Sequence, residues 1–392
     1  MKLSIEQVDL GGRRVFLRAD LNAPLEGGAV ADDTRLTAVV PTIRHALDRG
    51  ASVVLASHLG RPKGGPDAKY SLKPVAERLE RLLERPVPLA PDCVGDAVEG
   101  LAQALKPGHV LLLENLRFHP EEEANDDGFA RRLAGLADLY VNDAFAAAHR
   151  AHASIAAITR HLQPAAAGLL MQRELEALGR ILGSPARPLV AVLGGAKVSD
   201  KIALVEHLLS KVDALVIGGG MAFTFLRALG HGVGKSLVEV DRVEMARSTL
   251  EAARRRGVQV VLPIDAVVAA GLDSPSGRAV AVRDIPADQM GLDLGPLSVE
   301  RFAAVLKTAK TIVWNGPMGV FEKPAFATGT VALARAVAES PAFSVIGGGD
   351  TVAAVNQAGV TDRIGYISTA GGAFLEFLEG RSLPGVEALT EA

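Results

Sequence analysis

Short apolar runs alternate with amphipathic segments along most of this sequence, and no other feature limits its fold as strongly. The runs are Arg14–Leu17, Ser52–Ala56, Val110–Leu113, Leu139–Val141, Leu189–Leu193, Ala214–Ile217, Val258–Leu262, Thr311–Trp314 and Phe343–Ile346. Helical patterns lie between them, as at Leu36–Arg49, Leu72–Leu83 and Lys201–Lys211. Continuous apolar runs are typical of strands buried on both faces. The pattern therefore predicts an α/β fold with parallel sheets covered by helices on both sides.

The length of the chain and a segment that interrupts its helical pattern predict more than one domain. A chain of 392 residues is too long for one ordinary core. Residues 163–183 resemble one Ala/Leu-rich helix that opens after Pro164, and the segment GSPARP then interrupts the pattern before the next strand. A helix couples two lobes more stiffly than a flexible linker does. We place the first domain at residues 1–168 and the second at 169–378.

Charge and cysteine content exclude several classes of protein. The formal net charge is −3, which provides no overall field for nucleic acid or membrane binding, so any anion site must be local. The single cysteine, Cys93, excludes intramolecular disulfides and cysteine-rich metal clusters. The N-terminal residues lack a continuous apolar signal segment, and no stretch approaches the roughly 20 apolar residues of a membrane span. We expect a cytoplasmic protein.

In the first half, cationic side chains follow each predicted strand. They are Arg18, with Asp20 and Asn22 behind it, Arg35 at the next helix, His58, Arg61, Arg117, His149, Arg150 and His152. Ligands of open α/β sheets bind at the carboxyl ends of the strands, and arginine binds phosphate and carboxylate oxygens bidentately. This pattern predicts a site for a ligand with anionic groups. The acidic run Glu121–Asp127 is interpreted as a solvated loop and not as a metal site.

In the second half, glycine-rich turns follow three of the predicted strands, in Leu189–Lys201, Leu215–Phe223 and Phe343–Ala354. Glycine lets the backbone approach a ligand, and the amides of the following helix then face a phosphate. Lys197 and Lys201 share one helical face beside the first turn, and Asp350 is a candidate Mg²⁺ ligand. The segment Gly230–Ser236 resembles a Walker A loop but is one residue short, so we interpret it as a surface loop.

A series of ordered segments then carries a family resemblance over essentially the whole chain. RADLNAP, SHLGRP, ENLRFHPEEE, NDAFAAAHRAHAS, GGAKVSDKI, WNGPMGVFE and GGGDTVAA resemble the landmark segments of phosphoglycerate kinases. The resemblance implies a monomer of two Rossmann-like lobes joined by the interdomain helix, with residues 379–392 packing back on the first lobe. It implies small-molecule substrates only: 3-phosphoglycerate or 1,3-bisphosphoglycerate, and ADP or ATP with Mg²⁺.

The resemblance also implies residue roles. The glycerate ligand would be held by Asp20, Leu21, Asn22, Arg35, His58, Leu59, Gly60, Arg61, Arg117 and Arg150. The nucleotide would be held by Lys201, Gly291, Pro317, Glu322, Gly348, Gly349, Asp350 and Thr351, with Asp350 on the metal. The catalytic set would be Arg35, Lys197, Lys201, Gly371 and Gly372, acting after hinge closure of the lobes. Ala370 and Ala146 stand where the family commonly has glycine, which puts the local backbone in question.

Two other functions compete with this interpretation. A nicotinamide-dependent dehydrogenase would share the fold class, but the chain lacks a G-x-G-x-x-G fingerprint and carries many arginines in its first half. A phosphoglycerate-kinase-like scaffold without activity would not need Arg35, Lys201 and Asp350 together. A phosphotransferase is therefore the expected activity.

Overall fold

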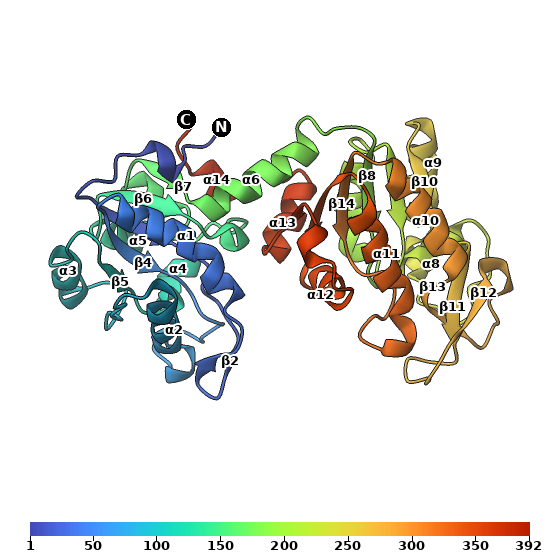
Figure 1. Ribbon diagram of the computed structural model, residues 1–392, viewed down its shortest axis with the longest axis horizontal. Coiled ribbons are helices and arrows are strands. Elements are labelled where there is room, and N and C mark those ends of the chain that lie inside the picture. Colours follow the sequence, from blue (N-terminus) through green and yellow to red (C-terminus); the bar gives the residue numbers. More distant parts are fainter. The chain divides into compact units, whose positions relative to one another are not determined.

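The computed structural model describes residues 1–392, which form two compact units (Figure 1). Unit 1 comprises Met1–Glu176 together with Ser382–Ala392, and unit 2 comprises Ala177–Arg381. Helix α6 (Leu169–Leu182) runs across the boundary in the sequence between the two units. None of the helices is both long enough and apolar enough to cross a membrane.

Unit 1 contains a five-stranded, wholly parallel sheet. Its strand order is β5 (Val110–Leu112), β4 (Ser52–Ala56), β1 (Arg14–Arg18), β6 (Leu139–Asn142) and β7 (Ala165–Ala167). The central strand β1 is buried because Leu17 pairs with Leu55 on one side and with Val141 on the other. The strands predicted from apolar runs are confirmed, with ends shifted by one residue in some cases.

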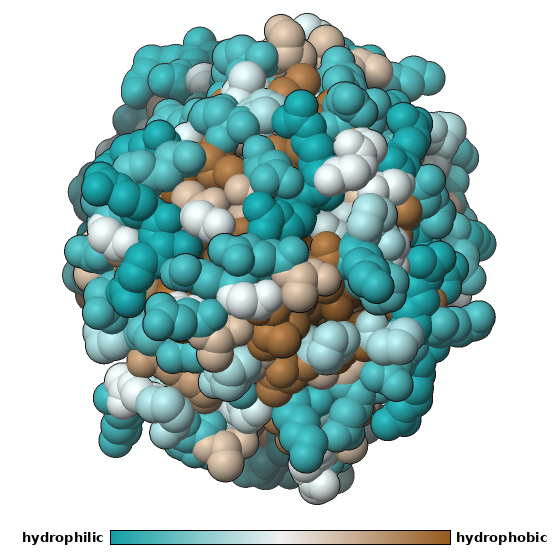
Figure 2. Space-filling view, turned by 90° about the vertical axis from the view of Figure 1, so that its left-hand side faces the viewer, coloured by the Kyte–Doolittle hydropathy of each residue, from teal (hydrophilic) through white to brown (hydrophobic).

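The remaining elements of unit 1 surround this sheet or extend from it. They are the hairpin β2 (Leu25–Glu26) and β3 (Ala29–Val30), helices α1 (Thr34–Asp48), α2 (Lys73–Leu83), α3 (Asp96–Gln103), α4 (Pro120–Glu123), α5 (Asp127–Ala134) and α14 (Pro384–Glu387), and 3₁₀ turns η1 (Ile5–Gln7), η2 (Ala68–Tyr70), η3 (Leu116–Phe118), η4 (Phe145–Ala147) and η5 (Ala157–Arg160). Figure 2 shows that hydrophilic residues cover most of one face of this unit, with apolar residues visible in recesses between them.

The prediction of one helix opening after Pro164 is wrong at its start. Residues 165–167 form strand β7, which pairs with β6 through Tyr140 and Ala165, and the helix begins only at Leu169. Alanine favours a helix, but here the open sheet edge offers backbone partners on both sides, since Thr390 N–H donates to the Ala165 carbonyl at 2.9 Å. Tertiary pairing therefore overrides local propensity.

Unit 2 contains a six-stranded parallel sheet and a smaller antiparallel one. The parallel order is β10 (Gln259–Val261), β9 (Ala214–Ile217), β8 (Leu189–Leu193), β14 (Thr311–Asn315), β15 (Phe343–Gly347) and β16 (Tyr366–Ile367). The antiparallel order is β12 (Arg278–Ala281), β11 (Asp265–Ala269) and β13 (Met290–Leu294). The sequence did not predict the antiparallel sheet, because its outer strand β12 is largely exposed and lacks an apolar run.

Helices and short turns complete unit 2. They are α7 (Ile202–Leu208), α8 (Met221–Ala228), α9 (Val243–Arg255), α10 (Pro296–Thr308), α11 (Thr328–Glu339), α12 (Gly349–Gln357) and α13 (Gly371–Leu378), with η6 (Ser199–Lys201), η7 (Val240–Arg242), η8 (Val282–Asp284), η9 (Pro324–Phe326) and η10 (Thr361–Arg363). Trp314 on the central strand β14 is fully buried in the core. The α/β class with parallel sheets is confirmed in both units.

Candidate active site

In unit 1, the predicted cationic residues follow strands β1, β4 and β6 at the carboxyl edge of the sheet, except that Arg35 lies in α1 and Arg117 lies within η3. His58 and Arg117 are buried, Arg35 and Arg150 are half-buried, and Arg61 is exposed. The neighbouring order of these strands explains the grouping, because parallel strands end at a common edge. The edge is therefore rich in groups that bind anions.

The loop that carries His58 is held by polar side chains from two other segments. Asn22 Oδ1 accepts the Gly60 N–H at 2.8 Å. Asn115 accepts the Leu59 N–H and donates to the Leu59 carbonyl, at 3.2 and 2.8 Å. Arg117 Nη1 donates to the Gly60 carbonyl at 2.7 Å. Leu59 and Gly60 thus fix the loop through their backbone, and Asn22 and Arg117 already bind protein groups there.

Arg35 is anchored within the same unit by a carboxylate. Its Nη1 lies 2.5 Å from Asp20 Oδ2, and the arginine side chain remains 39% exposed. The Leu21 N–H donates to Ser57 Oγ at 2.9 Å, which ties the Asp20 segment to the end of β4. Arg35 is therefore oriented by Asp20 while part of its guanidinium stays available to a ligand.

The residue roles predicted from the sequence did not include a buried network behind the edge, although Arg18 was among the cations that follow the predicted strands. Arg18, which closes β1, is only 1% exposed, and its Nε donates to Ser154 Oγ at 2.8 Å. Ser154 in turn donates through its hydroxyl to Glu122 Oε1 at 2.6 Å and through its N–H to Glu122 Oε2 at 2.9 Å. A charged residue that closes an apolar strand, as Arg18 does, was the available sequence signal.

The interpretation of Glu121–Asp127 as a solvated loop is right for residues 124–126, which lie between two helices, but wrong for the residues before and after them. Pro120–Glu123 forms helix α4, Asp127 opens α5, and Glu122 has no exposed surface. A run of like charges is usually solvated, but Glu122 faces the cations Arg18 and Arg117. Burial raises the pKa of the Glu122 carboxyl, while Arg18 and the Ser154 hydrogen bonds oppose that shift.

Two histidines of this cluster, His58 and His152, are held in their neutral form. Burial and then the charges of Arg18 and Arg117 place the pKa of His58 well below its usual value. The same causes lower the pKa of His152 to about 4. Arg18 Nη2 lies 3.2 Å from His58 Nδ1, so this nitrogen accepts. At neutral pH the histidines therefore act as hydrogen-bonding groups, and the arginines provide the positive charge.

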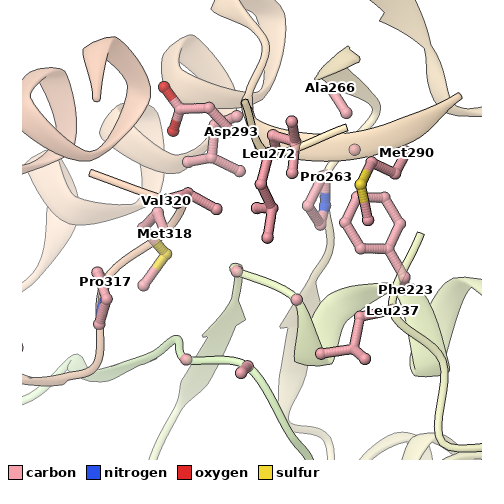
Figure 3. Close-up of a pocket in the computed structure, with 18 of the residues that line it drawn as sticks. Phe223, Leu237, Pro263, Ala266, Leu272, Met290, Asp293, Pro317, Met318 and Val320 are labelled. Atoms are coloured by element: carbon pink, nitrogen blue, oxygen red, sulfur yellow. The ribbon is translucent and has the colours of Figure 1, made fainter. Parts of the chain in front are cut away.

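In unit 2, the carboxyl edge of the parallel sheet borders a cavity of about 400 Å³ with a mainly apolar lining. Pro263, Leu272, Met318 and Val320 lie around this space in Figure 3, whereas the carboxylate of Asp293 points away from it. Of the predicted nucleotide residues, the lining includes Gly291, Pro317, Glu322 and Asp350. An apolar slot with a few polar groups at its border suits a flat heterocycle carrying a polar tail.

Glycine is required where the turns of this edge meet. Gly219 has φ +66°, and a Cβ there would lie 2.7 Å from the Gly195 backbone. Gly195 has φ +112° and itself lines the cavity. At Gly291 a Cβ would lie 2.1 Å from the Phe223 ring. The close backbone contacts therefore require glycine and leave main-chain groups facing the cavity.

Lys201 is the oriented cation of this edge. Its Nζ contacts Asn315 through the side-chain oxygen and lies 3.3 Å from the Asn315 carbonyl. Burial lowers the pKa of the Lys201 ammonium to about 8, although Asp200 and Asp350 oppose the shift, so the group is mostly charged at pH 7. Lys197, by contrast, is exposed.

Helix α12 presents its N-terminal amides after the Gly348 turn, where Gly348 has φ +96°. Thr351 is buried and its hydroxyl accepts the Gly316 N–H at 2.6 Å, so its backbone amide is the group left for an anion. Asp350 in the first turn is exposed. Helix amides and a lysine suit the phosphate groups of a polyphosphate, and an exposed carboxylate beside them suits the magnesium ion bound to those phosphates.

The alanines that replace the family's usual glycines lie in backbone that alanine can adopt. Ala370 precedes helix α13 with φ −105° and is fully buried. Ala146 lies inside the 3₁₀ turn η4, outside the positive-φ positions. Gly371 and Gly372 begin α13, where a Cβ at Gly371 would meet nothing within 4 Å. Neither alanine strains the backbone.

The Walker-like segment is a loop, as predicted. Most of residues 230–236 are exposed, and Ser236 is buried because its Oγ accepts the Gly291 N–H at 2.9 Å. This segment therefore supports the cavity wall through Gly291 and forms no phosphate cradle of its own. Each predicted site residue thus belongs to one of two sets, one in each unit.

Comparisons with known proteins agree over the whole chain. The family model described as phosphoglycerate kinase matches residues 5–381. A phosphoglycerate kinase of Moorella thermoacetica is 57% identical over 392 residues, covering 100% of this chain and 99% of that protein. One from Anaeromyxobacter sp. (strain K) is 56% identical over 392 residues, covering 99% of each.

Solved structures show the same similarity. The phosphoglycerate kinase structure from Coxiella burnetii aligns with a TM-score of 0.93 at 44% identity, covering 99% of this chain and 98% of that one. The phosphoglycerate kinase of Pyrococcus horikoshii OT3 aligns with a TM-score of 0.85 at 36% identity, with coverage of 99% and 98%.

Proposed function

The chain belongs to the phosphoglycerate kinase family, and on that premise we propose how its two units divide the family's reaction. The family transfers a phosphoryl group reversibly between 1,3-bisphosphoglycerate and ADP, giving 3-phosphoglycerate and ATP. Residues 1–168 with 379–392 bind the glycerate ligand, and residues 169–378 bind the nucleotide. The two Rossmann-like lobes of the family correspond to the two parallel sheets.

The grouping of cations at the edge of unit 1 supports the glycerate assignment most directly. A ligand with a phosphate at one end and a carboxyl-derived group at the other needs several guanidinium groups. The buried Arg117 and the half-buried Arg35 and Arg150 supply them. His58, Arg61 and the turn Asp20–Asn22 add hydrogen-bonding groups for the hydroxyl and phosphate oxygens. The loop around Leu59 and Gly60 fixes their spacing.

The cavity of unit 2 supports the nucleotide assignment. Its apolar walls near Gly291 and Pro317 take the adenine, and Glu322 takes the ribose hydroxyls. Lys201 and the amides of Gly348–Thr351 take the phosphates. When Mg²⁺ is bound with the nucleotide, it neutralises part of the phosphate charge, and Asp350 is its protein ligand.

The chemistry needs no general base. In the direction of ATP consumption the nucleophile is a carboxylate, which is ionised at pH 7 because its pKa is near ~4. What remains is to position the reactants and to neutralise the charge on the moving group. Arg35, Lys197, Lys201 and the amides of Gly371 and Gly372 perform that neutralisation. Hinge closure at the ends of α6 then brings the two ligands together and excludes water.

The family's glycolytic role supports a cytoplasmic site of action, and we propose that the protein works as a monomer. A coupled assay with ADP, Mg²⁺ and 1,3-bisphosphoglycerate tests the function. ATP formation that depends on both substrates is expected. ATP formation absent under these conditions, with both ligands still bound, would favour the scaffold. Nicotinamide reduction in place of phosphoryl transfer would favour the dehydrogenase.

A further inference from the structure

Three side chains with different ligand atoms meet in unit 1. Asp92 and Cys93 lie between helices α2 and α3, and His119 directly follows η3. One carboxylate oxygen, the thiol sulfur and one imidazole nitrogen all lie within 4.8 Å of one another. Neither the phosphoryl-transfer reaction nor the substrate sites proposed above use this group.

Each of the three side chains is already oriented by its surroundings. His119 Nε2 lies 2.6 Å from Asp92 Oδ1, and the imidazole stacks on the Phe129 ring at a centroid distance of 5.0 Å. Cys93 Sγ donates to the Glu114 carbonyl at 2.9 Å. The three groups therefore need only small movements to bind one cation together.

The site can be reached from solvent on one side. Cys93 is fully buried, whereas the side chains of His119 and Asp92 are 22% and 46% exposed. An ion can therefore approach past the carboxylate and the imidazole and contact the sulfur last. The exposed side also leaves room for a water ligand.

The local charge favours a cation. The carboxylates of Asp92, Glu122 and Glu114 interact electrostatically with the Cys93 sulfur. These acidic groups make the potential at the sulfur negative. A thiolate without a cation is disfavoured there, whereas a bound divalent cation would offset the negative charge.

We propose that Asp92, Cys93 and His119 form a binding site for one divalent cation of the zinc class. Sulfur, nitrogen and oxygen donors together suit Zn²⁺ or Co²⁺, whereas Mg²⁺ and Ca²⁺ prefer oxygen alone. Bond lengths of about 2.0–2.3 Å place tetrahedral ligand atoms roughly 3.3–3.6 Å apart. An atom pair at the 4.8 Å limit must therefore come closer by about 1 Å, whereas His119 Nε2 and Asp92 Oδ1, now 2.6 Å apart, must separate.

Protons balance in this binding step. The Cys93 Sγ–H bond breaks, its proton goes to solvent, and the sulfur forms a bond to the metal. The Nε2 proton of His119, which is donated to Asp92 without the metal, is transferred by way of solvent to Nδ1, and the neutral imidazole then binds the metal through Nε2. Asp92 loses the hydrogen bond from His119, and its carboxylate oxygen binds the metal. Water completes the fourth position.

Titration of the reduced, metal-free full chain with Co²⁺, without nucleotide, tests the site. Because Cys93 is the only cysteine, any thiolate-to-cobalt charge-transfer absorption arises from it. We expect one equivalent of Co²⁺ to produce this absorption, excess Zn²⁺ to abolish it, and excess Mg²⁺ to leave it unchanged. His119→Gln and Asp92→Asn, which keep the thiol, should each weaken Co²⁺ binding at least about tenfold.

A matched control lies in the same unit. His161 Nε2 is 2.9 Å from Asp127 Oδ1, and these side chains are 21% and 44% exposed, but no thiol is among their partners. His161→Gln should bind Co²⁺ like the unaltered protein. Circular dichroism checks that each variant is folded. No charge-transfer absorption at saturating Co²⁺, or unchanged binding in folded His119→Gln and Asp92→Asn, would overturn the proposal.

Discussion

The two units build their candidate sites at the same place on the same kind of sheet, but with different parts of the chain. Unit 1 uses charged side chains, such as Arg35 and Arg117, that are held by hydrogen bonds. Unit 2 uses backbone, because Gly195 and Gly219 bring main-chain groups to the cavity. A parallel sheet thus fixes where a ligand binds, while the residues after the strands decide how it is recognised.

Because one site uses charged side chains and the other uses backbone, the two sites should respond to different kinds of substitution. A site made of charged side chains responds to removal of one charge while the fold persists. A site made of close backbone contacts responds to added atoms and to the packing beneath it. Each unit also contains a buried aspartate whose carboxylate accepts backbone N–H groups at the start of a helix. Asp143 accepts from the first turn of α6, and Asp293 accepts from the first turn of α11. These two aspartates allow the first test.

The largest expected effect is on the pH dependence of unit 2 stability. Burial raises the pKa of Asp293 to about 7 from an ordinary value of 3.8. A raised native pKa contributes stability that is complete below the unfolded pKa and is lost as pH rises through about 7. The difference of 7 − 3.8, at ~1.36 kcal/mol per pKa unit, corresponds to a loss of about 4 kcal/mol. Asp293→Asn should flatten this decline.

Denaturant unfolding between about pH 4.5 and 8.5 measures this effect. Trp314 is the only tryptophan and is buried in unit 2, so its fluorescence reports that unit. Asp143→Asn is the control, because Asp143 lies in unit 1 and its pKa is raised to about 6. If wild type and Asp293→Asn show parallel Trp314 stability profiles, the assigned pKa shift is wrong.

The next effect tests the side-chain site of unit 1. Arg35→Ala should lower kcat on the order of 10²-fold, because a charge aimed at the transferring group is removed. Nucleotide affinity should stay nearly normal, since the nucleotide groups lie in unit 2. Steady-state kinetics and nucleotide titration measure the two quantities. Equal weakening of turnover and nucleotide binding would count against the division between units.

The backbone site of unit 2 is tested by adding one methyl group. At Gly219, alanine places its Cβ 2.7 Å from Gly195 at φ +66°. At Gly257, φ is +71° and nothing lies within 4 Å. In both variants the free energy of unfolding should fall by about 1 kcal/mol, because alanine is strained at a positive φ. Only Gly219→Ala should also weaken ATP binding, by roughly tenfold, measured by calorimetry; equal ATP affinity in both would contradict the role of close backbone contact.

The sequence predicted the parallel sheets well because their strands are continuous apolar runs. Leu189–Leu193 and Ala214–Ile217 have the predicted bounds, since burial on both faces leaves a strong composition signal. The prediction for residues 165–167 was wrong for the opposite reason. Their alanines carry a helix preference, and only the sheet edge beside β6 makes them a strand.

The candidate sites were predictable where the ligand group is a charged side chain that follows a strand, as with Arg35 and Arg117. Contacts made across the chain were not predictable. Ser154 joins Arg18 to Glu122 through a network that spans more than a hundred residues of sequence, and only the fold brings these groups together. The acidic run therefore looked solvated although its second residue, Glu122, is buried.

The smallest expected effect concerns that buried carboxylate. Glu122→Gln keeps the shape but disturbs the Ser154 hydrogen bonds that hold Arg18 and the loop carrying Arg150. We expect the KM for 3-phosphoglycerate to rise about three- to tenfold, which is about 1 kcal/mol. High salt should not remove the effect, because buried charges are screened weakly.

Glu123 is the matched control for Glu122. It lies in the same short helix, its side chain is 57% exposed, and its Oε1 lies 3.0 Å from Arg117 Nε. Glu123→Gln should change the same KM less than about twofold and lose even that effect at high salt. Because removing a negative charge by itself favours an anionic substrate, a lower KM in Glu122→Gln would show that Glu122 acts only as an opposing charge. A higher KM shows that it positions the cations of unit 1.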